Sequence, residues 1–305
     1  MRKIIGIGET ILDILFRDGQ PYAAVPGGSV YNGVVSLGRM GMDVTFISET
    51  GNDRVGQIIL ENMRENGVKT DSVNMFPDGK SPVSLAFLNE KNDAEYIFYK
   101  DYPRLRLDVR MPEMNKDDIL MIGSYYAISP LLRDNIKDVM DKAKDKGVII
   151  YYDVNFRSNH VSEAIKLMPA LIENFEYADI LRGSTDDFRN LFKTDDPDKA
   201  HDNVAIYCKN FICTDAGKDI HLYAGSFRKT YGVKPVETVS TIGAGDNFNA
   251  GVVYGLIKYD IGKDDLSGLS VDDWDRVIRC GIDFSAEVCR SVHNSVSKEF
   301  AASYC

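Results

Sequence analysis

The order of its short apolar runs constrains what this chain of 305 residues can fold into. Residues 3–8, 43–48, 119–122 and 148–153 are long enough for buried strands, and segments with helical spacing lie between them. Parallel strands need crossover connections of about a dozen residues or more, and these segments are long enough to provide them. The pattern predicts one α/β domain over residues 1–305, with a doubly wound, mainly parallel sheet and helices on both faces.

Two stretches interrupt this alternation. Residues 16–25 contain Gly and Pro as a hairpin does, and residues 82–89 and 95–100 alternate in polarity around a polar turn. We expect lid segments at about 14–26 and 82–105, inserted in the domain, to form a small β-sheet over the ligand site. An ordinary edge hairpin is the alternative.

A glycine turn near the C-terminus is the strongest candidate for a functional motif. Gly243, Ala244 and Gly245 precede a helical run, and Asp246 lies in its first turn. Free N–H groups at a helix start bind anions, and glycine lets the backbone approach a ligand closely. The carboxylate can cap the helix or accept a proton from a hydroxyl that attacks the anion. No Gly-Lys-Ser/Thr follows, so the motif is not a Walker A loop.

Carboxylates follow several of the predicted strands. Asp13, Asp153 and Asp215 come at or after strand ends, as Asp246 follows the glycine turn. Ligands of open α/β sheets collect beyond the carboxyl ends of the strands. We therefore expect these side chains to converge on one edge of the sheet.

Composition excludes several other classes of protein. A net charge of −10 argues against a nucleic-acid partner, which requires a basic surface. No apolar run approaches the roughly 20 residues that span a bilayer, and no N-terminal signal pattern is present, so we expect a cytoplasmic protein without a membrane partner. The five cysteines and four histidines are scattered, which predicts free thiols and identifies no metal ligands.

Three motifs occur in an order that carries a resemblance. They are Gly27-Gly28-Ser-Val-Tyr-Asn32, Asp153-x-Asn155-x-Arg157, and Gly243-Ala-Gly-Asp-Asn-Phe-Asn-Ala-Gly251. With them the chain resembles the ribokinase-like (PfkB) carbohydrate kinases over essentially its whole length. The resemblance implies a Rossmann-like domain with a β lid that closes over a sugar, and a possible homodimer through the lid. It also implies ATP and Mg²⁺ as cofactors.

The resemblance also implies roles for individual residues. Asp246 would be the base that takes the proton of the attacking hydroxyl, and the N–H groups of Gly243, Ala244 and Gly245 would hold the γ-phosphoryl group. The predicted substrate-binding residues are Asp13, Gly27, Gly28, Asn32, Lys100 and Arg157, and the predicted nucleotide-binding residues are Thr214, Gly217, Ser184 and Asp187.

Departures from the family pattern bear on the substrate and on ions. Ser240-Thr241-Ile242 stands where the family usually has Asp-Thr-Thr, which leaves a monovalent-cation site in doubt. Ser29-Val30 follows the first glycine turn, which favours fructokinase-like or 2-keto-3-deoxygluconate-kinase-like members that phosphorylate a primary hydroxyl of a small free sugar. Fructose is the preferred acceptor, Arg157 favours the acid sugar, and a nucleoside kinase ranks third. A non-catalytic sugar-binding regulatory protein is the alternative from another class.

Overall fold

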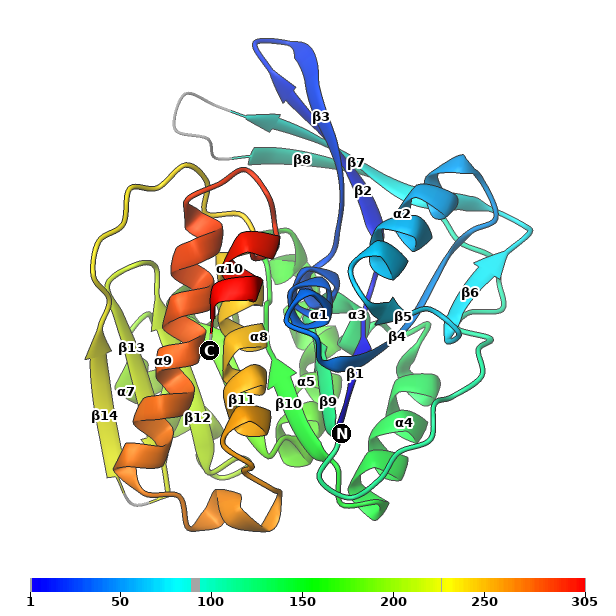
Figure 1. Ribbon diagram of the computed structural model, residues 1–305. Coiled ribbons are helices and arrows are strands. Elements are labelled where there is room, and N and C mark those ends of the chain that lie inside the picture. Colours follow the sequence, from blue (N-terminus) through cyan, green and yellow to red (C-terminus); the bar gives the residue numbers. More distant parts are fainter. Residues whose placement is uncertain (1, 89–93, 226, 305) are drawn as a thin grey trace.

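The computed structural model describes residues 2–88, 94–225 and 227–304 (Figure 1). In these ranges a large sheet has the strand order β14-β13-β12-β11-β10-β9-β1-β4-β5, and β6 pairs with β4 beside β5. Its strands are β1 (Lys3–Ile7), β4 (Asp43–Gly51), β5 (Val68–Lys69), β6 (Val73–Phe76), β9 (Ile119–Gly123), β10 (Ile149–Asp153), β11 (Ile180–Ser184), β12 (Asn210–Asp215), β13 (Asp219–Ala224) and β14 (Phe227–Gly232).

Most pairs in the large sheet are parallel. Among the described strands of this sheet, the antiparallel pairs are β12 with β13 and β13 with β14, at one edge. Helices cover both faces, as the alternation of strands and helices predicts. One face holds α1 (Ser29–Arg39), α2 (Arg54–Glu65), α8 (Ala244–Lys258) and α9 (Val271–Cys289); the other holds α4 (Arg133–Asp145), α5 (Ala164–Tyr177), α6 (Thr185–Phe192) and α7 (Pro197–Val204). Shorter pieces are α3 (Ser124–Ile128), α10 (Lys298–Ser303) and the 3₁₀ turns η1 (Ser158–Glu163) and η2 (Asp264–Ser267).

The side chains of the central strands divide between two cores. Ile4 of β1 packs in the core beneath α1 and α8, and its neighbour Ile5 packs in the core beneath α4 and α5. Successive strand residues point to opposite faces, so a strand covered on both sides is apolar throughout. This explains why the sequence shows unbroken apolar runs here.

A second, small sheet lies across the carboxyl edge of the large one, at the top of Figure 1. Its order is β3 (Gln20–Gly27), β2 (Ile11–Arg17), β7 (Lys80–Leu88), β8 (Ala94–Asp101). The central pair, β2 and β7, is parallel, and each outer strand is antiparallel to its neighbour. The predicted small sheet is confirmed, although part of its predicted turn at 90–94 falls outside the described residues.

Close packing of three helices fixes the ends that carry polar residues. A Cβ atom on Gly251 of α8 would lie 2.3 Å from the Cys280 carbonyl oxygen of α9. A Cβ atom on Gly33 of α1 would lie 3.2 Å from the Asp246 carbonyl oxygen of α8. Glycine thus lets α8 approach both neighbours, which brings the starts of α1 and α8 together.

The helices and the cysteine side chains can also be compared with the predictions from the sequence. Within the described ranges, no helix has both the length and the apolar character needed to cross a bilayer. Cys208, Cys213, Cys280 and Cys289 are free thiols, as predicted, and Cys305 lies outside the described residues.

Candidate active site

A cavity of about 660 Å³ opens between the small sheet and the carboxyl edge of the large sheet. Residues from both sheets line it, together with the starts of α1 and α8. The predicted site residues that line it are Asp13, Gly28, Asn32, Lys100, Arg157, Gly243, Gly245 and Asp246. The structure therefore brings together most of the predicted substrate and catalytic residues.

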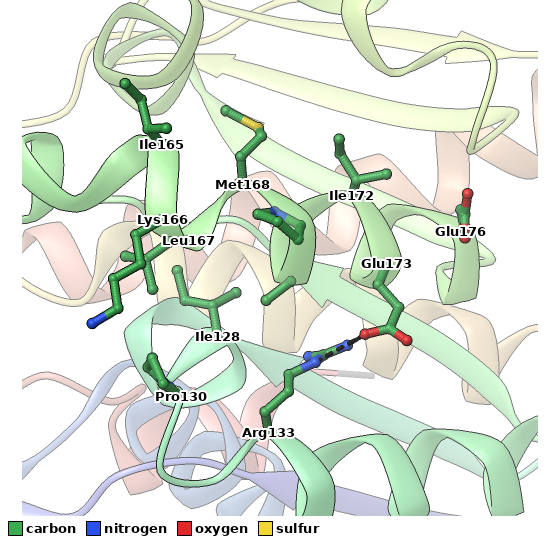
Figure 2. Close-up of a pocket in the computed structure, with 12 residues that line it drawn as sticks. Ile128, Pro130, Arg133, Ile165, Lys166, Leu167, Met168, Ile172, Glu173 and Glu176 are labelled. Atoms are coloured by element: carbon green, nitrogen blue, oxygen red, sulfur yellow. Dashed lines mark hydrogen bonds and ion pairs between the residues drawn. The ribbon is translucent and has the colours of Figure 1, made fainter.

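A larger hollow, of about 1050 Å³, lies elsewhere (Figure 2). It is a mainly apolar groove along α5, with Ile165, Met168 and Ile172 on one side and the Arg133–Glu173 ion pair at 2.5 Å beside them. None of the predicted site residues lines it. The smaller cavity is the candidate active site because it gathers carboxylates and the helix N-terminus.

Asp246 and Asn32 meet at the starts of α8 and α1. The Asn32 Nδ2 atom donates to Asp246 Oδ2 at 2.8 Å. Burial raises the pKa of Asp246 to about 7; the Asn32 hydrogen bond lowers it and the charge of Asp153 raises it. A carboxylate whose pKa lies near neutral pH suits a general base, which must both accept a proton and release it.

The turn before Asp246 has the backbone geometry expected of a glycine turn. Gly243 caps α8 at φ +81°, a left-handed conformation, and a Cβ atom there would lie 2.8 Å from the Asn294 carbonyl oxygen. The Ala244 N–H donates to the Thr241 carbonyl at 3.2 Å. An anion hole that uses this N–H must therefore take it from Thr241, so the predicted set of three donors stays a prediction.

Asp13 lies in the small sheet. We expected it just past the end of β1, but the chain becomes extended again at Ile11, and Asp13 lies inside β2, paired with β3 and β7. Its carboxylate accepts a hydrogen bond from the Ser84 hydroxyl, and burial raises its pKa to about 6. Alternation along β2 turns Asp13 towards the cavity, so the strand reaches the same site that we predicted for a loop.

The two turn glycines leave room for this arrangement. A Cβ atom on Gly27 would lie 2.9 Å from Asp13 Oδ2, and one on Gly28, at φ +134°, would lie 2.2 Å from the Glu9 carbonyl oxygen. Gly27 does not line the cavity itself. Any side chain at either position would displace the Asp13 carboxylate or the adjoining backbone.

Two cations predicted to bind substrate differ in their partners. Lys100 of β8 forms an ion pair with Glu9 Oε2 at 2.7 Å, and Tyr102 donates to the other Glu9 oxygen at 2.5 Å. Arg157 follows β10 and lines the cavity, and its positive charge partly opposes the burial that raises the pKa of Asp13 and Asp246. Of the two, Arg157 is placed to meet an anionic substrate directly.

Arg182 is a cavity residue that the sequence did not single out. It lies in the middle of β11, where its Nη1 donates to Asp153 Oδ1 at 2.9 Å and its Nη2 donates to Thr214 Oγ1 at 2.6 Å. Asn249 donates to the other Asp153 oxygen at 2.9 Å. The only available signal was position, since Arg182 directly follows the strand-like residues 178–181.

The family can now be named from a comparison with known families. A model described as "pfkB family carbohydrate kinase" matches residues 1–293. The chain belongs to this family.

Individual relatives agree with the family. The probable fructokinase-5 of Arabidopsis thaliana is 26% identical over 287 residues, 88% of this chain and 85% of the relative. A crystal structure of fructokinase from Vibrio cholerae O395 with fructose, ADP and calcium has a TM-score of 0.84 at 19% identity, covering 98% of this chain and 96% of that one. A Salmonella enterica aminoimidazole riboside kinase with its riboside and an ATP analogue has a TM-score of 0.79 at 20% identity, covering 97% and 96%.

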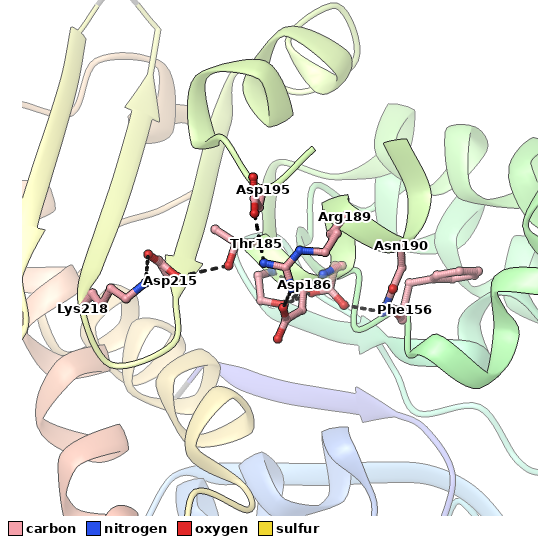
Figure 3. Close-up of polar contacts among 10 residues, drawn as sticks. Phe156, Thr185, Asp186, Arg189, Asn190, Asp195, Asp215 and Lys218 are labelled. Atoms are coloured by element: carbon pink, nitrogen blue, oxygen red, sulfur yellow. Dashed lines mark hydrogen bonds and ion pairs between the residues drawn. The ribbon is translucent and has the colours of Figure 1, made fainter. Parts of the chain in front are cut away.

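Kinases of the pfkB family need a nucleotide region, and the residues predicted for it are spread along the same edge. Gly217 has φ +76° in the turn after β12, and a Cβ atom there would meet open space. Asp215, at the end of β12, accepts from Thr185 and pairs with Lys218, both at 3.3 Å (Figure 3). None of these residues, nor Thr214 itself, lines the cavity.

Ser184 and Asp187 form a capping box at the start of α6. The Asp187 carboxylate accepts from the Ser184 N–H at 2.6 Å and from the Phe156 N–H at 2.6 Å. Burial raises the pKa of Asp187 to about 6. Both side chains are engaged with protein here, so their nucleotide role stays a prediction. In the described part of the chain, no three His, Cys, Asp or Glu side chains gather as metal ligands.

Proposed function

We propose that this carbohydrate kinase transfers the γ-phosphoryl group of ATP to a primary hydroxyl of fructose. The observation that carries the proposal is the position of Asp246, beside Asn32, at the N-terminus of α8, and facing the same cavity as Asp13. The fructokinase of Vibrio cholerae, whose structure contains fructose and ADP, supports the choice of sugar and nucleotide.

The arrangement supports an in-line transfer. The Asp246 carboxylate accepts the proton of the attacking hydroxyl, whose oxygen forms a bond to the γ-phosphorus as the bond to the bridging β–γ oxygen breaks. The positive end of the α8 dipole and the backbone of residues 243–245 stabilise the transferred group.

The sugar would be held by groups that can both donate and accept. The Oδ1 atom of Asn32 is buried and has no partner within the described residues, which makes it an acceptor for a sugar hydroxyl. The Asp13 carboxylate, carried by β2 of the small sheet, can accept a hydrogen bond from a second hydroxyl. We further propose that β2, β3, β7 and β8 act as the lid of a single-domain kinase, since they supply this side of the pocket.

Mg²⁺ belongs to the proposal only as a partner of the nucleotide. In kinases this ion is held through one or two carboxylates together with substrate phosphates, and it neutralises charge on those phosphates. The described residues offer no dedicated protein cage for the ion. The family departures at Ser240 and Ile242 leave potassium dependence to be measured.

Arg157 favours a second candidate, an acid sugar such as 2-keto-3-deoxygluconate. Its guanidinium lines the cavity, and a carboxylate on the substrate would give it a charged partner.

Turnover with fructose, 2-keto-3-deoxygluconate, ribose and a nucleoside, each with and without potassium, tests the proposal. Fructose should give the highest kcat/KM. If 2-keto-3-deoxygluconate is preferred, and Arg157→Gln abolishes that preference, the second candidate replaces the first. Sugar binding without any ATP consumption would favour a non-catalytic protein.

The outward face of the small sheet supports a homodimer. Ile97 and Tyr99 of β8 are 45% and 58% exposed. Leu85 of β7 is the partner of Ile97, and Ile14 of β2 is the partner of Leu85. We propose that a second copy covers this apolar face. Sedimentation should show a dimer that Tyr99→Glu dissociates; a monomeric wild-type protein would contradict the proposal.

We also propose that the kinase is located in the cytoplasm, where ATP is available. Recovery of the protein with membranes would contradict this location.

A further inference from the structure

A buried arginine lies beside the glycine turn, in the same cavity as Asp13. The Arg182 side chain lines the cavity although only 7% of the residue is exposed. A Cβ atom on Gly245 would lie 3.1 Å from Arg182 Nη2 and 3.3 Å from Nη1. The guanidinium therefore packs on the backbone of the segment that would hold the phosphoryl group, and glycine at 245 leaves it the space.

The protein contacts of Arg182 leave part of the side chain unused. Nη1 binds Asp153 and Nη2 binds Thr214, but the buried Nε has no partner within the described residues. Buried polar atoms without partners are few in native proteins and call for an explanation. A ligand next to Gly245, or a shift of the side chain on binding, would supply the missing contact.

A purely structural role is the competing explanation. Asp153 is 5% exposed, and a buried carboxylate needs a partner, which Arg182 provides. However, Asn249 already donates to the second Asp153 oxygen, and Tyr151 donates to Asn249 at 2.8 Å. A neutral pair at 153 and 182 would satisfy the same fold. Charge pairing alone does not explain why a full cation lies against the anion-binding turn.

We propose that Arg182 is a catalytic residue whose guanidinium contacts the transferring phosphoryl group at residues 243–245. The inference rests on the proposed kinase function and identifies the cation of that site. Phosphoryl transfer spreads negative charge over the equatorial oxygens, and a planar guanidinium binds such oxygens through paired N–H donors. Because Asp153 and Thr214 fix the side chain before the nucleotide arrives, little reorganisation accompanies the reaction.

Four variants separate the two explanations. R182Q removes the cation and leaves Asp153 without its charge partner, whereas D153N keeps the cation. The double variant D153N/R182Q removes both charges and retains polar side chains that can pair, so it guards against a loss of fold. R182K keeps a charge but not the planar fork. Thermal unfolding of each variant shows which of them are folded.

The expected results concern turnover with the best sugar of the panel. R182Q and the double variant should both lose about 10²–10³-fold in kcat, as removal of one transition-state donor does, with sugar KM changed less than threefold. D153N should lose less than R182Q. Recovery of the double variant to within tenfold of wild type would overturn the proposal, because it would show that Arg182 only neutralises Asp153.

Nucleotide binding without sugar keeps this test separate from the choice of substrate. Calorimetry with AMP-PNP and with ADP should show that the double variant weakens AMP-PNP about tenfold while ADP changes less than twofold, as the loss of one charged hydrogen bond predicts. Equal effects on both nucleotides would overturn the contact with the terminal phosphoryl group. If the wild type phosphorylates no sugar but binds AMP-PNP in this Arg182-dependent way, the proposed acceptor fails and the assignment of Arg182 stands.

Discussion

Replacing the proposed base should greatly lower activity and stabilise the fold. Asp246→Asn removes the carboxylate that would accept the proton, and its Oδ1 can still accept from Asn32. Loss of a general base costs about 10²–10⁴ in rate, so kcat should fall by that factor. The same change removes a charge that the folded protein holds at a cost, because burial raises its pKa.

The size of the stability gain follows from the pKa. A rise from 3.8 to about 7 spans roughly three units, and at 1.36 kcal/mol per unit this is about 4 kcal/mol. Asp246 keeps some solvent contact through the cavity, which screens its charge. We therefore expect the stability gain to be half of this free energy, about 2 kcal/mol. Between pH 3.8 and 7 the folded protein binds more protons than the unfolded chain, so this group's contribution falls as pH rises and is constant above about 7.

Urea unfolding at pH 5 and pH 8 measures this difference. The variant should exceed wild type by under about 1 kcal/mol at pH 5 and by about 2 kcal/mol at pH 8. Asp13 and Asp187, whose pKa values are also raised, are present in both proteins and largely cancel. A gain that does not depend on pH, or no gain at pH 8, would refute the buried charge at Asp246. Near-wild-type turnover would refute its role as base.

Two more changes probe the glycine turn and the sugar pocket. Gly243→Ala should cost about 1 kcal/mol more stability than the control Gly41→Ala in thermal unfolding. Both glycines have positive φ, but of the two only a Cβ atom at residue 243 would face a carbonyl oxygen at 2.8 Å. Equal losses of stability would refute the close approach. Asp13→Asn should raise the sugar KM at least tenfold and leave the KM for ATP within twofold, since Asp13 is carried by β2 of the small sheet and not by the turn at residues 243–245. An unchanged sugar KM would remove Asp13 from the binding site.

The layered fold followed directly from the sequence, because a sheet buried on both faces requires unbroken apolar strands. Ile4 and Ile5 are consecutive residues that pack in different cores, so both must be apolar. Such unbroken apolar runs can be recognised in the sequence. Short elements such as α3, β5 and β6 were not anticipated, since five residues or fewer show no reliable period. Their positions depend on contacts with the rest of the sheet.

Within the site, position along the chain predicted some residues and not others. The Gly243 turn and Asp246 are adjacent in the chain, so their positions at the start of a helix could be predicted from the sequence. Arg182 was missed because a single arginine within a strand forms no recognisable pattern, and its partners lie 29 and 32 residues away. Asp13 was expected in a loop because the restart of the strand at Ile11 is set by pairing with β7, which is distant in sequence.

Two carboxylates that line the cavity, Asp13 and Asp246, belong to different layers of the molecule. Asp13 is carried by β2 and Asp246 by α8, so an acceptor that hydrogen-bonds to both joins the two layers through its own framework. Contacts made by the far end of such a molecule then help to align its reacting end. An acceptor shortened at the Asp13 end should therefore react more slowly even at saturation, and water, which cannot reach both layers at once, should be a poor competitor for the phosphoryl group.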